Sequence, residues 1–174
     1  GKRGVAGTVL VHKILGAAAE SGLDIHSLKA LGEDLVKDIK TVGVALTGAT
    51  VPEVGKPGFV LADDEIEFGV GIHGEPGYRK EKIKPSYALA EELIHKIKSE
   101  FNWQQDDDFG ILVNGLGATP LMEQYVFTQD SLNILAQDQL NITYKMVGNY
   151  MTAIDMSGIS LTMIKTNPMI LKYL

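Results

Sequence analysis

The chain has 174 residues, of which 45% are hydrophobic and 22% are charged, a composition typical of one globular domain. Its net charge of −6 at pH 7 lacks the basic excess of most nucleic-acid-binding proteins. Its apolar runs are far shorter than the ~20 residues that a membrane-spanning helix needs. The absence of cysteine excludes disulfides and thiolate metal sites, and it favours a reducing compartment such as the cytoplasm.

Apolar residues spaced three and four apart predict four helices and a short final one. With the capping or opening residue first, they run from Thr8 to about Gly22, from Leu28 to Ile39, from Pro85 to Ile97, from Thr119 to Leu135, and onward from Asn167. Runs of β-branched and aromatic residues predict six strands, at 42–46, 59–62, 66–72, 109–113, 142–147 and 159–164. The fold class expected is α/β: one domain over residues 1–174, with a six-stranded mixed sheet and helices packed on its faces.

A glycine-rich segment, residues 69–77, contains a single histidine, His73, where a strand is expected to become a loop. Four glycines in these nine residues weaken a strand and indicate close backbone approach. Such an uncrowded imidazole can serve as a base, a ligand or a nucleophile near neutral pH. From the local pattern, a functional histidine and a turn that merely contains one remain open alternatives.

The other histidines fit structural or surface positions. His12 and His95 lie on expected helices, and His26 lies just before one. The spacing of His73 and Glu75 is similar to the H-x-E motif of zinc deaminases, but those enzymes need cysteines that this chain lacks. A metal site is therefore not expected.

Three further segments can be interpreted either as purely structural or as functional. Residues 114–120, NGLGATP, lie between a strand and a helix, where a phosphate could bind, but a tight turn before a helix is favoured. Residues 106–108, three aspartates, indicate an exposed turn. A basic stretch is expected to be a solvated loop, with phosphate attraction or partner docking as the alternative. Its residues are Arg79, Lys80, Lys82 and Lys84.

Several blocks of the chain, in order, closely resemble the dihydroxyacetone kinase substrate-binding subunit family, DhaK. The longest is LADDEIEFGVGIHGEPG at residues 61–77. The others are GVAGTVLVHK at 4–13, TVP at 50–52 with GKP at 55–57, VNGLGATP at 113–120 and MTAIDMSG at 151–158. Because the blocks extend almost from end to end, the resemblance covers nearly the whole chain.

The resemblance implies a two-domain α/β subunit, of which this chain is the second, C-terminal half. In the family, the histidine of the GIHGEPG motif adds to the ketone of dihydroxyacetone and forms a hemiaminal, which assigns both catalysis and substrate binding to His73. The family's first domain carries a Ser-Gly-His-Glu-Pro stretch and an aspartate that act on the hydroxyl receiving phosphate, and neither is recognisable here. The chain also opens on Gly1 without a methionine, which suggests a longer protein.

The resemblance further implies several partners: dihydroxyacetone, the missing first domain, a DhaL-like nucleotide-binding subunit and a second copy in a homodimer. ATP or ADP with magnesium is expected on that subunit, with no cofactor or metal on this chain. The absence of a nucleotide-binding domain after residue 174 favours a phosphotransferase relay as the donor. A coactivator that senses dihydroxyacetone without phosphorylating it is the alternative function, and a phosphate site at residues 115–119 is a third.

The hemiaminal hypothesis also implies a dependence on pH. Only neutral imidazole is nucleophilic, so capture is expected to weaken below about pH 6.5, the reference value for histidine. Asp63, Asp64 and Glu65 lie nearby in the sequence and are expected to move that threshold upward.

Overall fold

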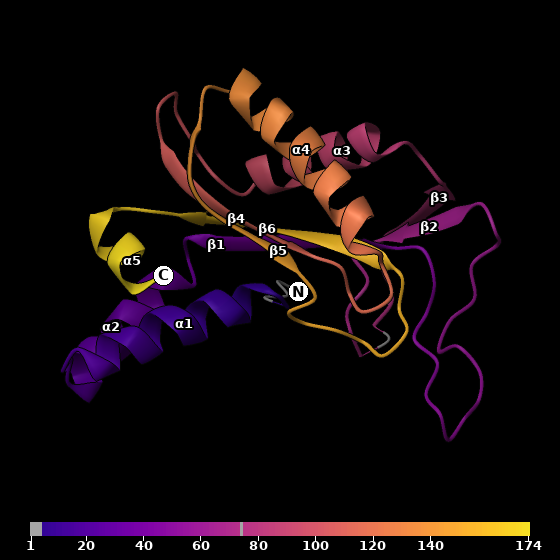
Figure 1. The fold of residues 1–174 in the computed structure, drawn as a ribbon, viewed down its shortest axis with the longest axis horizontal. Helices are drawn as coiled ribbons and strands as arrows, with labels where there is room; N and C mark the ends of the chain where they lie inside the picture. Colours follow the sequence, from indigo (N-terminus) through magenta and orange to yellow (C-terminus); the bar gives the residue numbers. More distant parts are fainter. Residues whose placement is uncertain (1–4, 74) are drawn as a thin grey trace.

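The computed structural model describes residues 5–73 and 75–174. A six-stranded sheet in the order β3-β2-β1-β6-β4-β5 carries helices on both faces (Figure 1). The strands are β1 (Ile39–Ala45), β2 (Glu65–Phe68), β3 (Arg79–Lys82), β4 (Asp108–Asn114), β5 (Asn141–Gly148) and β6 (Gly158–Lys165). The helices are α1 (Gly7–Glu20), α2 (Ile25–Leu35), α3 (Ser86–Lys98), α4 (Leu121–Gln137) and α5 (Pro168–Tyr173).

The sheet is mixed, as the sequence predicts. β4 and β5 run parallel, joined by α4 as a crossover, whereas the other neighbouring strands are antiparallel. The centre of the sheet is the pair β1 and β6, which stays in register from Ile39 opposite Ile164 to Ala45 opposite Gly158. On one side of this pair lie β4 and β5, which are equally long, and on the other lie the four-residue strands β2 and β3.

The core has two layers, one on each face of the sheet. α3 and α4 cover one face, and α1, α2 and α5 cover the other (Figure 1). β6 contributes to both layers because alternate side chains point to opposite faces: Leu161 and Met163 face α3 and α4, whereas Ile164 faces α1. Apolar residues alternate with Ser160 and Thr162 along β6, and this period of two makes the strand easy to identify in the sequence.

The helices form where one apolar face meets the sheet. In α1, Leu10 and Ile14 are fully buried and lie four residues apart, as the period of a helix requires. The side chain of Asp24 caps α2, and that of Asn167 caps α5 by accepting the N–H of Ile170 at 2.8 Å. The predicted cap at Thr8 is wrong, because α1 already begins at Gly7 with no side-chain cap.

One predicted helix boundary is corrected by the structure. The second helix ends at Leu35, and Ile39, expected on its apolar face, opens β1 opposite Ile164. Backbone bonds from Lys37 and Asp38 to the last turn close the helix at this point. The apolar spacing suits either structure, and pairing with β6 decides the outcome.

Two strand predictions are also corrected. Residues 59–62 form no strand, while the charged segment Arg79–Lys82, expected to be a loop, is β3 and pairs with β2. The strand predicted at 66–72 ends at Phe68, because Gly69 adopts a positive φ of 78°. The predicted total of six strands therefore agrees with the structure, although one of the six is a different segment.

Within residues 5–73 and 75–174, no helix has the length and the apolar character needed to cross a bilayer.

Candidate functional site

His73 lies in the loop that connects β2 to β3, and this loop is fastened to the sheet at both ends. At its start, the N–H of Gly69 donates to the carbonyl of Gly43 on β1 at 2.7 Å. At its end, the N–H of Gly77 donates to the carboxylate of Glu67, a side chain that is only 6% exposed. A Cβ on Gly77 would lie 2.1 Å from the carbonyl oxygen of Phe68, so this close return to β2 requires glycine.

The imidazole of His73 points into open space, with its side chain 81% exposed. Its backbone N–H donates to Oε2 of Glu75 at 2.9 Å, and Nδ1 lies 3.6 Å from Oε1 of the same carboxylate. Gly71 leaves room for that carboxylate, since a Cβ there would lie 2.1 Å from Oε2. The loop therefore presents an accessible imidazole beside one acidic group.

The carboxylate beside His73 differs from those expected from the sequence. Asp64 lies 3.6 Å from the ammonium of Lys82, and Glu65 accepts the N–H of Ala62 at 3.0 Å. Of the described carboxylates, Glu75 is the one within 4 Å of the ring. No local pattern in the sequence singles out Glu75, because the acids at 63–65 are also near His73 along the chain.

The His73 loop packs against a small apolar cluster. Val70 and Ile72 pack against the buried side chains of Leu116, Ala153 and Met156. These three come from the segments 113–120 and 151–158, so the structure brings together blocks that are far apart in the sequence. The cluster holds the backbone on which His73 stands.

The turn at residues 115–119 is held by backbone bonds. The N–H of Ala118 donates to the carbonyl of Met156 at 3.0 Å, and the N–H of Ala153 donates to that of Leu116 at 2.9 Å. The space beside Gly115 is filled, because a Cβ there would lie 2.0 Å from Nε2 of Gln124. These contacts agree with the tight-turn interpretation and leave little room for a phosphate at Gly115.

Thr119 does not cap α4, contrary to the sequence-based expectation. The helix begins at Leu121 with Pro120 in the N-cap position and no side-chain cap. The Thr119 hydroxyl instead accepts the N–H of Gly158 at 2.9 Å and donates to the carbonyl of the same residue. It therefore joins the turn to the start of β6.

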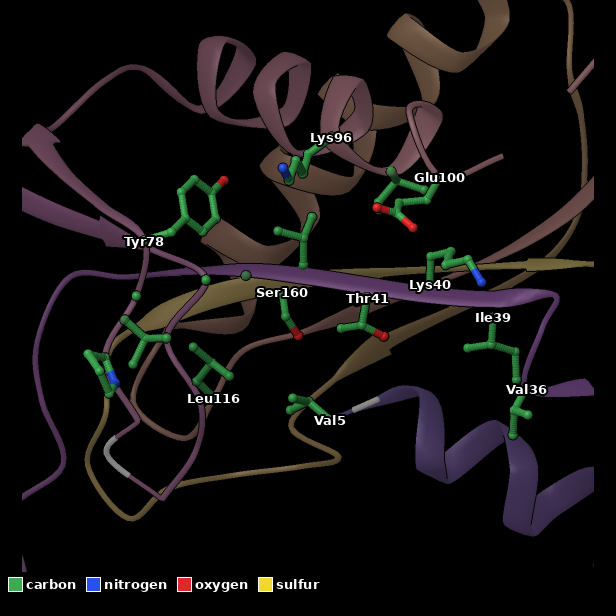
Figure 2. A pocket seen from close by; sticks show the side chains of 17 residues that line it. Val5, Val36, Ile39, Lys40, Thr41, Tyr78, Lys96, Glu100, Leu116 and Ser160 are labelled. Atoms are coloured by element: carbon green, nitrogen blue, oxygen red, sulfur yellow. The ribbon is translucent and has the colours of Figure 1, made fainter. Parts of the chain in front are cut away.

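A groove of about 590 Å³ borders the other side of the His73 loop. It follows β1 upstream of the residues that pair with β2, and Gly69, Val70, Pro76 and Gly77 form one of its walls. Figure 2 shows Lys96 and Glu100 above β1 and Leu116 below it, so the groove wraps around the strand. His73 is not among the lining residues, and the imidazole is thus outside this groove.

The remaining sequence candidates have ordinary surroundings. His12, His26 and His95 are exposed on helices. The basic stretch is largely neutralised by neighbouring acids: Arg79 and Lys84 both contact Glu92, and a hydrogen bond from Lys84 holds the pKa of Glu81 below its ordinary value. In the described part of the chain, no three histidine or acidic side chains gather as metal ligands would.

The architecture is that of a mixed α/β domain that presents a histidine loop beside its sheet. The chain belongs to the Dak1 domain family, whose model matches residues 1–174. The resemblance to dihydroxyacetone kinase substrate-binding subunits is thereby confirmed.

Relatives of two kinds are similar to this chain. It is 62% identical over 165 residues to the dihydroxyacetone-binding subunit DhaK of the PTS-dependent dihydroxyacetone kinase of Lactococcus lactis, covering 95% of this chain and 50% of that protein. It is 51% identical to the DhaKLM operon coactivator DhaQ of the same organism, covering 92% of this chain and 49% of that protein. The chain thus spans about half the length of the curated relatives it matches.

A solved structure supports the fold. The dihydroxyacetone kinase operon co-activator Dha-DhaQ superposes with a TM-score of 0.93 at 48% identity, over 98% of this chain and 53% of that one. This match confirms the α/β fold class and extends the similarity to relatives of the regulatory kind.

Proposed function

We propose that this chain is the dihydroxyacetone-binding component of a dihydroxyacetone kinase, and that His73 holds the ketone as a covalent hemiaminal. The observation that carries the proposal is the accessible imidazole on a loop fixed at both ends, within the motif shared with the DhaK family. An imidazole nitrogen adds to a carbonyl carbon, which glycerol lacks although its hydroxyls are similar. Covalent capture therefore discriminates between the two compounds by chemistry.

Anchoring also suits phosphoryl transfer. A ketone held on His73 keeps its terminal hydroxyl in one place, and positioning supplies much of the catalysis in such reactions. The imidazole is 81% exposed, whereas a transfer site has to exclude water. Because the described residues leave the imidazole open, another domain or subunit has to close over it.

That requirement agrees with the partners implied by the resemblance. We propose that the chain is the C-terminal half of a longer subunit, whose first domain acts on the substrate hydroxyl. A DhaL-like subunit with ATP or ADP and magnesium would supply the phosphoryl group. A phosphotransferase relay, a homodimer and a cytoplasmic location remain predictions.

The second candidate function is a coactivator that binds dihydroxyacetone and regulates a transcription factor. The similarity to DhaQ, in sequence and in structure, favours it. Both functions use capture at His73, so capture alone does not separate them. Phosphorylation of dihydroxyacetone by the full-length protein, supplied with a nucleotide-binding subunit, separates them: turnover supports the kinase component, and capture without turnover supports the coactivator.

The test of capture is intact-protein mass spectrometry after rapid desalting, on the full-length polypeptide with dihydroxyacetone or glycerol. We expect a reversible adduct of one substrate mass with dihydroxyacetone alone, which is lost in His73→Ala. His95→Ala is the matched control, since it removes an exposed histidine from α3 and should keep the adduct. A folded wild-type protein without an adduct, or an adduct that persists in His73→Ala, would contradict the proposal.

The dependence on pH gives a second test. The adduct should weaken as the pH is lowered into the acid range, because protonated imidazole is not a nucleophile. An adduct that strengthens steadily down to about pH 5 would argue against a neutral imidazole as the attacking group.

A further inference from the structure

We propose that Glu75 is a positioning residue for the capture of the ketone. Its carboxylate selects the imidazole tautomer of His73 that carries the proton on Nδ1, which leaves the lone pair of Nε2 available for attack. This inference rests on the proposed function, in which His73 is the nucleophile.

The two oxygens of Glu75 have separate partners. Oε2 accepts the backbone N–H of His73 at 2.9 Å, and this bond fixes the carboxylate beside the ring. Oε1 then faces Nδ1 at 3.6 Å. An ionised carboxylate only accepts hydrogen bonds, so a neutral imidazole beside it presents its N–H at the near nitrogen. The separation exceeds a hydrogen bond, but such bonds are often long in unliganded sites and shorten with substrate.

The backbone is shaped to hold this carboxylate. The N–H of Gly71 donates to the carbonyl of Glu75 at 3.2 Å, which folds the loop back across His73. Gly71 also leaves the space that Oε2 occupies, since a Cβ there would lie 2.1 Å away. A glycine in the motif thus makes room for the acid, and the acid holds both the backbone and the ring of His73.

The tautomer matters because one ring nitrogen has to be bare. In water, neutral histidine favours the proton on Nε2, the nitrogen that extends furthest from the backbone. With the proton on Nδ1, Nε2 forms a bond to the carbonyl carbon while the carbonyl π pair moves onto oxygen. That oxygen takes a proton from water, and Nδ1 of the substituted ring releases its proton to water. One proton is transferred in sum, and Glu75 stabilises the positive charge that the ring carries in between.

Substitution by glutamine tests this arrangement because an amide has one acceptor oxygen where a carboxylate has two. If the amide oxygen of the variant accepts the His73 N–H, the NH₂ group of the same amide faces Nδ1 and donates to it. The ring proton then moves to Nε2 and blocks the attacking nitrogen. Glu75→Gln should therefore reverse the tautomer with little change in size.

The experiment combines ¹⁵N NMR of histidine-labelled full-length protein with the rate of adduct formation. Spectra of ligand-free protein at about pH 8, where histidine is neutral, distinguish protonated from bare ring nitrogens. We expect the proton of His73 on Nδ1 in the wild type and on Nε2 in Glu75→Gln. Adduct formation in the variant should be at least about tenfold slower, as for loss of a charge-assisted hydrogen bond.

Two further variants make the result specific. Glu65→Gln is the matched control, because Glu65 also accepts a backbone N–H, from Ala62, without contacting the ring. It should change neither readout. Gly71→Ala displaces the carboxylate and leaves both side chains chemically intact, so it should shift the tautomer as Glu75→Gln does, and it replaces that variant if glutamine prevents folding.

The outcomes separate this inference from the proposed function. A wild-type spectrum with the proton on Nε2 overturns the role of Glu75, as does a Glu75→Gln protein that keeps both the Nδ1 proton and the wild-type rate. Absence of any adduct in the wild type contradicts capture itself, and the wild-type spectrum still decides whether Glu75 sets the tautomer.

Discussion

Replacement of Thr119 by valine removes one hydroxyl from a side chain that is 8% exposed and nearly keeps its shape. That hydroxyl bonds both the N–H and the carbonyl of Gly158. Loss of each bond, with the partner group left buried, costs about 1.5 kcal/mol. We therefore expect Thr119→Val to lower the free energy of unfolding by about 3 kcal/mol, measured by urea denaturation. For a domain of this size, the midpoint of thermal unfolding should fall by about 6–12 °C.

Two companion variants identify the cause. Thr119→Ser keeps the hydroxyl and loses one buried methyl group, so it should cost only about 1 kcal/mol. Thr119→Asp distinguishes the bonds to Gly158 seen in the structure from the predicted role of Thr119 as the cap of α4. As a helix cap, aspartate would be a good replacement for threonine. In the structure, aspartate loses the donor to Gly158 and buries an unpaired carboxylate, so it should destabilise more than valine does. A Thr119→Asp protein as stable as the wild type would refute the reasoning.

Two further predictions concern surface and loop positions. The pKa of Asp155 lies below its ordinary value, because the carboxylate accepts the backbone N–H of Thr50 at 2.6 Å. A carboxylate with a depressed pKa stabilises the folded state above its unfolded pKa of about 4, and this stabilisation is lost as the pH falls through its folded pKa. Asp155→Asn should therefore flatten the acid limb of a plot of melting temperature against pH. An unchanged acid limb would contradict this. Gly77→Ala should lower the free energy of unfolding, measured by urea denaturation, by about 2 kcal/mol or more, because the added Cβ meets the carbonyl of Phe68. Gly58→Ala is the control and should be nearly neutral, since the nearest atom to its added Cβ lies 3.8 Å away. Equal stability of the two variants would contradict the close approach at Gly77.

The sequence predicts most accurately the helices and strands that pack against the core. β6 and α3 have their apolar residues at the period of the element, because each packs a complete face against the core. β3 shows no such pattern. All four of its residues are charged, and it forms only because β2 offers a register in which Glu65 lies opposite Lys82 and Phe68 opposite Arg79. A pairing of this kind depends on tertiary contacts that no local pattern reveals.

The strand predicted at residues 59–62 is wrong because its composition resembles that of a strand while its packing does not. Phe59 and its neighbours have strand composition, but Phe59 packs against the cluster of Leu116 and Met156 beneath the His73 loop. Its backbone passes Gly48 so closely that a Cβ there would lie 2.6 Å from the Phe59 carbonyl. Phe59 is thus partly buried against a loop, whereas Val60 is 76% exposed, so the apolar composition of this segment does not indicate a strand.

The candidate site shows the same limits. The glycines around His73 and the motif that contains it identify this residue from the sequence, and the structure confirms that it lies in the loop after β2. The sequence does not identify Glu75 as its neighbour, since proximity along the chain equally favours the acids that precede the strand end. Which of several nearby acids faces a ring depends on the direction in which the loop turns, and here Gly71 decides it.

The charged composition of β3 has a consequence for how the protein behaves in solution. β3 is the outermost strand on its side of the sheet, where unpaired N–H and C=O groups can recruit a strand from another molecule. The charged side chains of β3 disfavour such a contact, because pairing with another strand would take exposed Arg79, Lys80 and Lys82 out of water. The edge strand that follows the histidine loop is thus protected against pairing with a strand of another molecule.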